Sequence, residues 1–599
     1  MSAAVEDELV EVRASEASRR IPVFGGRCAG QAGSDWLYVF TLQRPMTLAD
    51  DVPLRIELLA DGEMRAYPGQ LVGTTAFDVT VSTPVKLPDK LPSVSLSTDP
   101  SFLLEQLLER LAELGEDASD LPLALFGFRQ PELGAPAGDL DDDSANEFQL
   151  DALRAVLERD VTYVWGPPGT GKTTTLALIA EHLVRRGMRV LAVASTNVAV
   201  DNAVLKVAER LAGSGSVVRF GTPQLAALRE PAGLAGATRG NLMQTMPLPF
   251  DTDVIPDSNL ILSEAKDLAS GPTGKILRGR AAQNDIGVTV VSPKRLPDPR
   301  EEAARQRALR RAAVLGATLS RLALSPDVAA SGFDAVLLDE ASAAPLPSAF
   351  FAASLARAKV VALGDPKQLP PVALSSRPAA RRWLQRDVFA QAGLDDDDPR
   401  AVLLREQYRM HPSIARVANE LVYGGRLIDA TRDGSHCEAV RLLDTSGEGG
   451  RCIRLDGSRQ NELHAGLAIE AASQLLTEIE SGPDERPVAI ITPYRAQSRL
   501  IWRMLRDARL DRRVDVGTVH RFQGLERQAV VFDTVEAAPE RPAPFLCGGY
   551  GSEAMRLINV AITRARSRLV LIANLDHLRR SLRRDSTLLG LLELVREGG

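Results

Sequence analysis

The chain has 599 residues, of which 45% are hydrophobic and 25% charged, so it has enough material for more than one buried core. Its formal net charge of -7 excludes a globally basic surface, and any binding of nucleic acid would depend on local basic patches. The four cysteines lack CxxC spacing, which argues against a zinc domain and predicts reduced thiols in a cytoplasmic protein: Cys28, Cys437, Cys452 and Cys547.

The first 145 residues predict an accessory region ahead of the main body. Short alternating runs at Trp36–Leu42, Leu54–Leu59 and Phe77–Val81 favour a small β-barrel over residues 1–100. Residues 101–145 are predicted to form a helix and a linker, because leucines recur at helical spacing and a Gly-, Pro- and Asp-rich stretch follows. The charged N-terminus and the shortness of every apolar run predict neither export nor a membrane span.

From residue 146 onward, apolar β-type runs alternate with helical segments, a pattern that predicts parallel sheets covered by helices on both faces. The expected strands are Val161–Trp165, Val190–Ala194, Val288–Val291, Ala335–Leu338 and Val360–Leu363, then Val488–Ile491, Val514–Gly517, Val530–Asp533 and Leu569–Ala573. The gap between these two sets predicts two α/β lobes, at 146–400 and 401–599. Residues 214–285 are poorly periodic and are interpreted as an insertion in the first lobe.

The stretch GPPGTGKT, from Gly166 to Thr173, follows an expected strand and opens an expected helix. Its backbone N–H groups can converge on phosphate oxygens, Lys172 can reach the β- and γ-phosphates, and the Thr173 hydroxyl can ligate Mg²⁺. The alternative is an ordinary glycine-rich turn. The expected nucleotide contacts are Gly166, Pro167, Pro168, Gly169, Thr170, Gly171, Lys172, Thr173 and Thr174.

A second landmark is the apolar strand that ends in Asp339 and Glu340. Strand ends in open α/β sheets face the ligand crevice. Asp339 can hold the Mg²⁺ shell, and Glu340 can polarise the water that attacks a γ-phosphate. A solvated acidic loop is the alternative reading of these two residues alone.

Seven further segments occur in an order that resembles superfamily 1 helicases of the Upf-like branch, over most of the chain. They are Asn146–Gln149, Ala194–Asn202, Gly364–Pro371, Glu406–Pro412, Thr492–Gln497, Val516–Glu526 and Asn559–Arg566. The resemblance implies two RecA-like lobes that bind ATP and Mg²⁺ between them, with the N-terminal barrel as an accessory domain. It also implies movement in the 5′→3′ direction, which the short connection between Thr534 and Leu557 supports.

The resemblance assigns roles to residues of both lobes. Gln149 would read the adenine edge, Tyr408 would stack on the base, and Glu526 would contact the ribose side. Gln368 would sense the γ-phosphate. Arg409 and Arg564 would reach across the crevice to neutralise charge on the transferring phosphoryl group, although either arginine taken singly could be a surface residue.

A single strand of DNA or RNA is expected to lie across both lobes, held through phosphates and sugars without sequence preference. The expected contacts are Ser195, Thr196, Asn197, Asn202, Thr318, Pro493, Tyr494, Thr518 and His520. The arginine-rich stretch 305–321 either adds attraction for the strand or is a solvated helix face. DNA and RNA are not distinguished by these residues.

One position departs from the family pattern. Ala343 stands where many relatives have a glutamine, which removes a polar link between the γ-phosphate and the strand and puts coupling in question. The sequence therefore predicts a monomeric ATP-dependent 5′→3′ helicase. Two alternatives stay open: a nucleic-acid-stimulated ATPase that translocates or remodels without unwinding, and a weakly catalytic scaffold switched by ATP.

Overall fold

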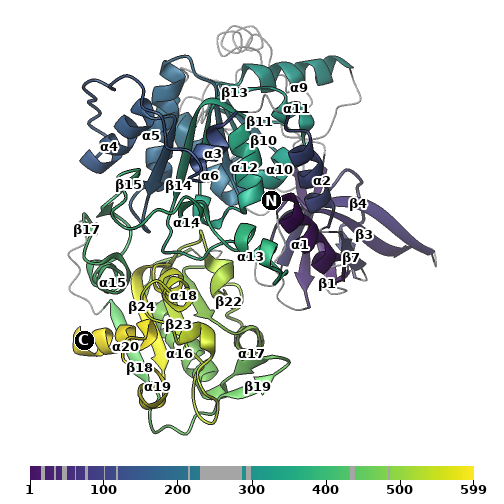
Figure 1. Ribbon diagram of the computed structural model, residues 1–599. Helices are drawn as coiled ribbons and strands as arrows, with labels where there is room; N and C mark the ends of the chain where they lie inside the picture. Colours follow the sequence, from purple (N-terminus) through teal and green to yellow (C-terminus); the bar gives the residue numbers. More distant parts are fainter. Residues whose placement is uncertain are drawn as a thin grey trace.

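A computed structural model of the chain shows an N-terminal antiparallel sheet and two parallel-sheet lobes (Figure 1). It describes residues 1–14, 20–32, 35–43, 50–60, 63–74, 78–92, 94–99, 101–115, 119–212, 216–228, 287–291, 299–431, 439–482 and 486–598. Most of the predicted insertion at 214–285 and Cys437 lie outside the described residues.

The N-terminal sheet has the strand order β2-β5-β4-β3-β7-β1-β6, with β1 also paired to β2. An antiparallel sheet is therefore present where a small barrel was predicted, but the β1–β7 pairing that would close it involves only three residue pairs, at Arg20, Ile21 and Pro22. The strands are β1 (Arg20–Ala32), β2 (Asp35–Leu42), β3 (Pro53–Ala60), β4 (Glu63–Thr74), β5 (Asp78–Thr83), β6 (Lys90–Leu91) and β7 (Val94–Thr98).

Two helices tie this sheet to the first lobe. The helix α1 (Ser2–Ala14) was not predicted; it packs against α2 (Ser101–Ala112) and α13 (Pro378–Trp383). Its Glu8 carboxylate accepts the backbone N–H groups of Leu374 and Ser375, at 2.8 Å each. The first hundred residues are thus a helix followed by a sheet.

The first lobe contains an eight-stranded, all-parallel sheet of order β11-β10-β12-β9-β13-β14-β8-β15. Its strands are β8 (Val161–Trp165), β9 (Val190–Ala194), β10 (Val217–Phe220), β11 (Val288–Val291), β12 (Val314–Thr318), β13 (Phe333–Leu338), β14 (Ala356–Gly364) and β15 (Ala401–Leu403). The other helices of this part are α3 (Leu121–Leu125), α4 (Glu147–Glu158), α5 (Lys172–Arg185), α6 (Asn197–Leu211), α9 (Pro299–Arg311), α10 (Leu319–Ala323), α11 (Pro326–Ala329), α12 (Leu346–Ser354) and α14 (Val388–Gln391). Because β15 pairs with β8, the first sheet extends past the predicted boundary at residue 400.

The second lobe contains a five-stranded parallel sheet of order β18-β24-β23-β21-β22. Its strands are β18 (Val440–Asp444), β21 (Val488–Thr492), β22 (Val514–Thr518), β23 (Arg527–Asp533) and β24 (Ala565–Ala573), beside the short pairs β16 (Glu406–Gln407) with β17 (Ile428–Asp429) and β19 (Ile453–Leu455) with β20 (Ser458–Gln460). Its helices are α15 (Pro412–Ala418), α16 (Glu462–Glu478), α17 (Arg495–Asp507), α18 (Glu553–Ile562), α19 (Leu575–Ser581) and α20 (Thr587–Gly598).

The burial of the strands explains why their sequences are continuous apolar runs and do not alternate between apolar and polar residues. Every residue of β8, β9 and β12 is buried, as is every residue of β21. Parallel strands covered by helices on both faces have no polar face. The predicted α/β architecture is therefore confirmed in both lobes.

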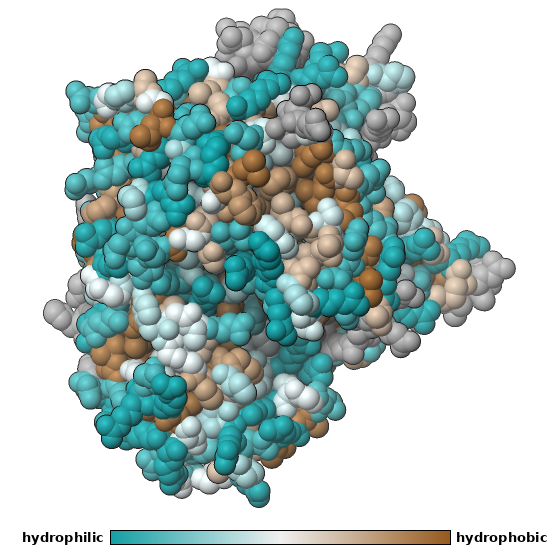
Figure 2. Space-filling view, in the orientation of Figure 1, coloured by the Kyte–Doolittle hydropathy of each residue, from teal (hydrophilic) through white to brown (hydrophobic). Residues whose placement is uncertain are grey.

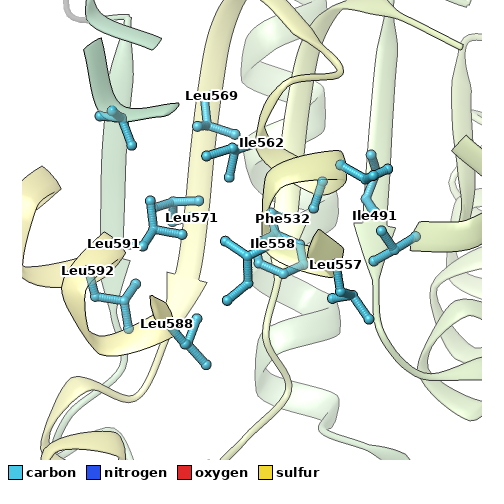
Figure 3. Packing of buried hydrophobic residues seen from close by; sticks show 14 of the residues in the cluster. Ile491, Phe532, Leu557, Ile558, Ile562, Leu569, Leu571, Leu588, Leu591 and Leu592 are labelled. Carbon is cyan, nitrogen blue, oxygen red and sulfur yellow. The ribbon is translucent and has the colours of Figure 1, made fainter. Parts of the chain in front are cut away.

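The core of the second lobe joins β21, β23 and β24 to α18 and α20 (Figure 3). Phe532, Ile558, Leu571 and Leu591 are all fully buried in this cluster. The side chains of α18 and α20 point into the sheet from the same side, so the C-terminal helix closes this core.

We expect Leu571→Ala to lower the free energy of unfolding of the second lobe by about 2–5 kcal/mol, because it removes buried methyl groups and leaves a cavity. Leu133→Ala is the matched control, since Leu133 is 79% exposed and its truncation is expected to cost less than about 0.5 kcal/mol. Urea titration followed by tryptophan fluorescence measures both. Equal midpoints would contradict the packing in Figure 3.

Most of the face shown in Figure 2 is hydrophilic, and apolar side chains gather over α2, α10 and α12. None of the helices within the described ranges combines the length and the apolar character needed to cross a lipid bilayer.

Candidate active site between the two lobes

The loop after β8 has the geometry of a phosphate cradle. The Gly166 N–H donates to the Gly364 carbonyl at the end of β14, at 2.8 Å, and the Lys172 ammonium donates to the Gly166 carbonyl, at 2.9 Å. Gly169 and Gly171 have φ angles of +79° and +81°. A Cβ on Gly166 would lie 2.1 Å from Lys172 Cγ, so only glycine fits. The loop thus leads into the N-terminus of the 14-residue helix α5, where backbone N–H groups can bind an anion.

The two acids lie at the carboxyl end of β13, as predicted. Asp339 is 4% exposed, and its carboxylate accepts the Glu340 N–H at 2.9 Å. Burial, with the neighbouring Glu340 charge, raises the pKa of Asp339 to about 7, while Lys172 acts in the opposite direction. Glu340 has a φ of +50°, an uncommon conformation for a residue with a side chain. Asp339 and Lys172 are therefore brought to one place, with Glu340 held beside them.

Arg409 comes from the segment leading into the second lobe and lies directly on the phosphate loop. A Cβ on Gly169 would be 2.7 Å from Arg409 Cβ, and the Tyr408 N–H donates to the Gly169 carbonyl at 2.9 Å. The Arg409 guanidinium pairs with Glu526 at 2.6 Å, and Arg566 pairs with the same carboxylate at 2.8 Å. The predicted contact of Glu526 with the ribose stays a prediction, since in this structure its carboxylate joins two arginines.

Arg564 reaches the same place from the end of α18. Its guanidinium donates to Gln368 Oε1 at 3.4 Å and to the Leu525 carbonyl at 3.2 Å, and it is 2% exposed. Burial and the positive charge of Arg409 lower the pKa of Arg564 to about 10, and the Glu340 carboxylate acts in the opposite direction. Both predicted arginines are thus beside the predicted acid, and Gln368 contacts one of them.

The base-binding end is formed by the start of α4 and the segment after β15. Gln149 is 5% exposed and shares a reciprocal cap with Asn146, whose N–H donates to Gln149 Oε1 at 3.2 Å. Gln149 Nε2 lies 2.9 Å from where a Cβ on Gly171 would be, so this amide abuts the phosphate loop. Tyr408 is 49% exposed, and its hydroxyl hydrogen-bonds with Asn146 and Glu406.

A buried network that was not predicted connects the site to the second lobe. The Asp365 carboxylate accepts from Trp165 Nε1 at 3.0 Å, from Gln368 Nε2 at 2.9 Å and from the Tyr423 hydroxyl at 2.7 Å. Asn559 Nδ2 in turn donates to the Tyr423 oxygen at 2.8 Å. Asp365 and Asn559 lie inside recognised motifs and could have been proposed from the sequence, whereas Tyr423 carries no such signal.

The substitution at Ala343 leaves a neighbouring polar link in place. Ser342 is fully buried, and its hydroxyl accepts the Asp365 N–H at 3.2 Å. The segment after Glu340 is therefore still hydrogen-bonded to the segment that carries Gln368.

The predicted strand contacts of the first lobe cluster at the ends of two adjacent strands. β9 and β12 pair in parallel register, Ala194 with Thr318, so Ser195 and Thr196 lie next to Thr318. Thr196 and Asn202 are exposed, and the half-buried Ser195 has a hydroxyl without a partner among the described residues.

Three of the predicted strand contacts are covered in this structure and stay predictions. The side chains of Asn197 and Thr318 are fully buried and that of Tyr494 is 5% exposed, so none of them faces a solvent-filled groove in this structure. Asn197 bonds to Arg219 at 2.6 Å, Thr318 to Asp51 at 2.6 Å, and Tyr494 to Glu536. Internal polar partners occupy these groups. In the second lobe, the half-buried Pro493 follows β21, the half-buried Thr518 ends the paired strand β22, and the exposed His520 lies just after it.

Comparison with known proteins gives the family. Two AAA domain models match the chain, one at residues 144–243 and 293–376 and the other at 384–576. The DNA polymerase alpha-associated DNA helicase A of Schizosaccharomyces pombe is 28% identical over 471 residues, covering 72% of this chain and 63% of that protein. The mouse 5'-3' DNA helicase ZGRF1 is 26% identical over 452 residues (70% and 21%), and the Regulator of nonsense transcripts 1 homolog of Arabidopsis thaliana is 26% identical over 451 residues (72% and 32%).

The chain matches less than two thirds of the length of each of these relatives. The model matched at residues 144–243 and 293–376 falls on the first lobe, with the phosphate loop and the two acids. The model matched at residues 384–576 falls on the second lobe, with Arg409 and Arg564. The chain therefore belongs to the Upf1-like branch of the superfamily 1 helicases, a family of ATP-hydrolysing enzymes.

Proposed function

We propose that the chain is an ATP-driven helicase that moves 5′→3′ along single-stranded DNA or RNA and separates duplexes. The observation that carries this proposal is the meeting of Arg409 and Arg564 with Glu340 at the phosphate loop. Nucleotide hydrolysis at that position requires parts of both lobes, so it can be coupled to their relative movement.

The residues present fit ATP and a divalent cation. The phosphate loop offers backbone N–H groups and Lys172, and the buried Asp339 carboxylate with the Thr173 hydroxyl would hold Mg²⁺. The cation would supply positive charge that neutralises the charge developing on the phosphates. Glu340 would orient the attacking water and accept its proton, and the guanidinium groups of Arg409 and Arg564 would stabilise the transferring phosphoryl group.

The buried network supports coupling between lobes. Gln368 contacts Arg564 on one side and Asp365 on the other, and Asp365 reaches Tyr423 and Asn559. Loss of the γ-phosphate would therefore change a chain of hydrogen bonds that runs from the first lobe to the second. Because Ser342 preserves the link to Asp365, we favour a motor over an ATP-switched scaffold despite Ala343.

The direction is proposed from resemblance. The relative ZGRF1 is named a 5'-3' DNA helicase, and this chain has the short connection between Thr534 and Leu557. We further propose that residues 146–403 form one mechanical unit and 404–599 the other, with the N-terminal sheet as the accessory domain. That the protein is a monomer and is located in the cytoplasm stays a prediction.

The test is a pair of assays on the full chain. We expect ATP hydrolysis to rise at least about tenfold with a 30-nucleotide DNA or RNA oligomer, as for motors that close around a strand. A forked duplex with only a 5′ tail should be unwound, whereas one with only a 3′ tail should not. Stimulation without unwinding would favour a translocase, no stimulation would favour a scaffold, and activity only on 3′ tails would reverse the direction.

A further inference from the structure

Two aspartates of the N-terminal sheet contact the part of the first lobe where strand binding was predicted. They are Asp50 and Asp51, in the turn just before β3. The Asp50 carboxylate accepts the backbone N–H of Asn197, the first residue of α6, at 2.7 Å. The Asp51 carboxylate accepts the Thr318 hydroxyl at 2.6 Å and pairs with the Arg321 guanidinium at 2.5 Å.

The donors in this contact are the kinds that bind phosphodiesters. A backbone N–H at the start of a 15-residue helix, a threonine hydroxyl and an arginine guanidinium all favour anionic oxygens. Further hydrogen bonds fix the position of Asn197: its Oδ1 accepts from Arg219, and Arg219 pairs with Asp201. Two carboxylates therefore occupy the donors that a strand would need.

The contact is buried and tightly constrained. Asp51 is 1% exposed and the Arg321 side chain is 7% exposed. Asp51 has a φ of +67°, and Gln70 of β4 donates to its carboxylate at 3.0 Å. Beside it, Asn197 Nδ2 donates to the Val72 carbonyl at 3.3 Å. The turn before β3 and the end of β4 thus cover the ends of β9 and β12.

We propose that the Asp50–Asp51 turn substitutes for strand phosphates, keeps the N-terminal sheet docked over the first lobe, and must leave before a strand can bind there. The proposal rests on the proposed function, because it assumes that this surface binds a polynucleotide. The reason for displacement is electrostatic: the same N–H, hydroxyl and guanidinium groups cannot serve both the carboxylates and the phosphates, and the two anions repel each other.

The protonation of Asp50 supports a contact that is released easily near neutral pH. Burial raises the pKa of Asp50 to about 7; the facing Asp51 and Asp201 carboxylates act in the same direction, and the Asn197 N–H and Arg219 oppose them. Arg321 faces the neighbouring Asp51. Because the pKa is raised above its ordinary value, docking is firmest at low pH and weakens as pH rises through about 7.

The test compares full-length variants by the fluorescence anisotropy of labelled dT20 without nucleotide. We expect Asp51→Asn to bind dT20 about tenfold more tightly than the wild type, because Arg321 loses its docked partner. Asparagine tolerates a positive φ, so this change preserves the turn. Asp89→Asn, an equal change of charge at an exposed position just before β6, is the control and should shift affinity less than about twofold.

A second pair of readouts uses hydrogen exchange and the pH dependence of binding. In the wild type, saturating dT20 should speed hydrogen exchange in residues 50–54, and dT20 affinity should rise from pH 6 to pH 8 more than in Asp50→Asn, which mimics the protonated carboxyl. Unchanged exchange, or equal affinities of the wild type and Asp51→Asn, would overturn the displacement while leaving the proposed function intact. Failure of every variant to bind dT20 and RNA would overturn both.

Discussion

Replacing Glu340 by glutamine is expected to abolish ATP turnover while leaving nucleotide binding nearly unchanged. Glu340 follows β13 directly after Asp339, which interacts with Lys172, and Glu340 itself interacts with both arginines. Glutamine keeps the size of the side chain but cannot accept a proton from the attacking water. Removing a general base of this kind costs about 100- to 10,000-fold in rate.

Steady-state phosphate release with and without an oligonucleotide measures turnover, and fluorescence of a mant-labelled ATP measures binding. Glu209→Gln is the matched control, since Glu209 is a solvent-exposed glutamate on α6 that pairs only with Lys206 among the described residues. A Glu340→Gln rate within tenfold of the wild type would show that another group activates the water. Loss of mant-ATP binding would instead assign Glu340 to the binding of nucleotide.

The parts of the site that the sequence predicted are those encoded locally. Lys172, Thr173 and Asp339 each follow an apolar strand, and parallel strands place their carboxyl ends on one edge of the sheet. The arginines were predicted by resemblance alone, and the structure brings both of them to the phosphate loop. The same resemblance identified Gln368, which contacts Arg564.

The parts that could not be predicted depend on contacts between distant segments. Asn197 and Thr318 were expected to be open to a strand, but their partners Asp50 and Asp51 lie 147 and 267 residues away in the chain. Polar residue types in a motif do not show whether another domain covers them. Similarly, Tyr423 was missed because its role arises only from packing between Asp365 and Asn559.

The contacts between the two lobes and those between the N-terminal sheet and the first lobe suggest how hydrolysis and strand binding are controlled separately. In our proposal, hydrolysis is controlled where the lobes meet, through Gln368 and Arg564, and access of the polynucleotide is controlled where the N-terminal sheet meets the first lobe. The two controls share the first-lobe sheet, because β9, which leads to Asn197, is the direct neighbour of β13, which leads to Asp339. A polynucleotide that displaces the Asp50–Asp51 turn would therefore act on β9, the β-strand next to the one that leads to the catalytic acids.

Replacing Arg564 by alanine is expected to lower kcat about 1,000-fold or more with little change in KM, because an arginine that stabilises the transferring phosphoryl group acts mainly in the transition state. Arg564→Lys should not restore activity. The guanidinium of Arg564 donates at once to Gln368 Oε1, the Leu525 carbonyl and the Val560 carbonyl, a geometry that a lysine ammonium cannot reproduce.

A buried arginine could also act by holding the second lobe together, and the experiment must separate the two roles. Binding of ADP with aluminium fluoride, which resembles the transferring phosphoryl group, should weaken far more than binding of ADP alone in Arg564→Ala. Arg579→Ala, which removes a partly exposed ion pair with Glu593 elsewhere in the lobe, should change neither. If both ligands weaken equally and the unfolding midpoint falls, Arg564 is a packing residue, and the stabilising charge in the transition state must come from Arg409.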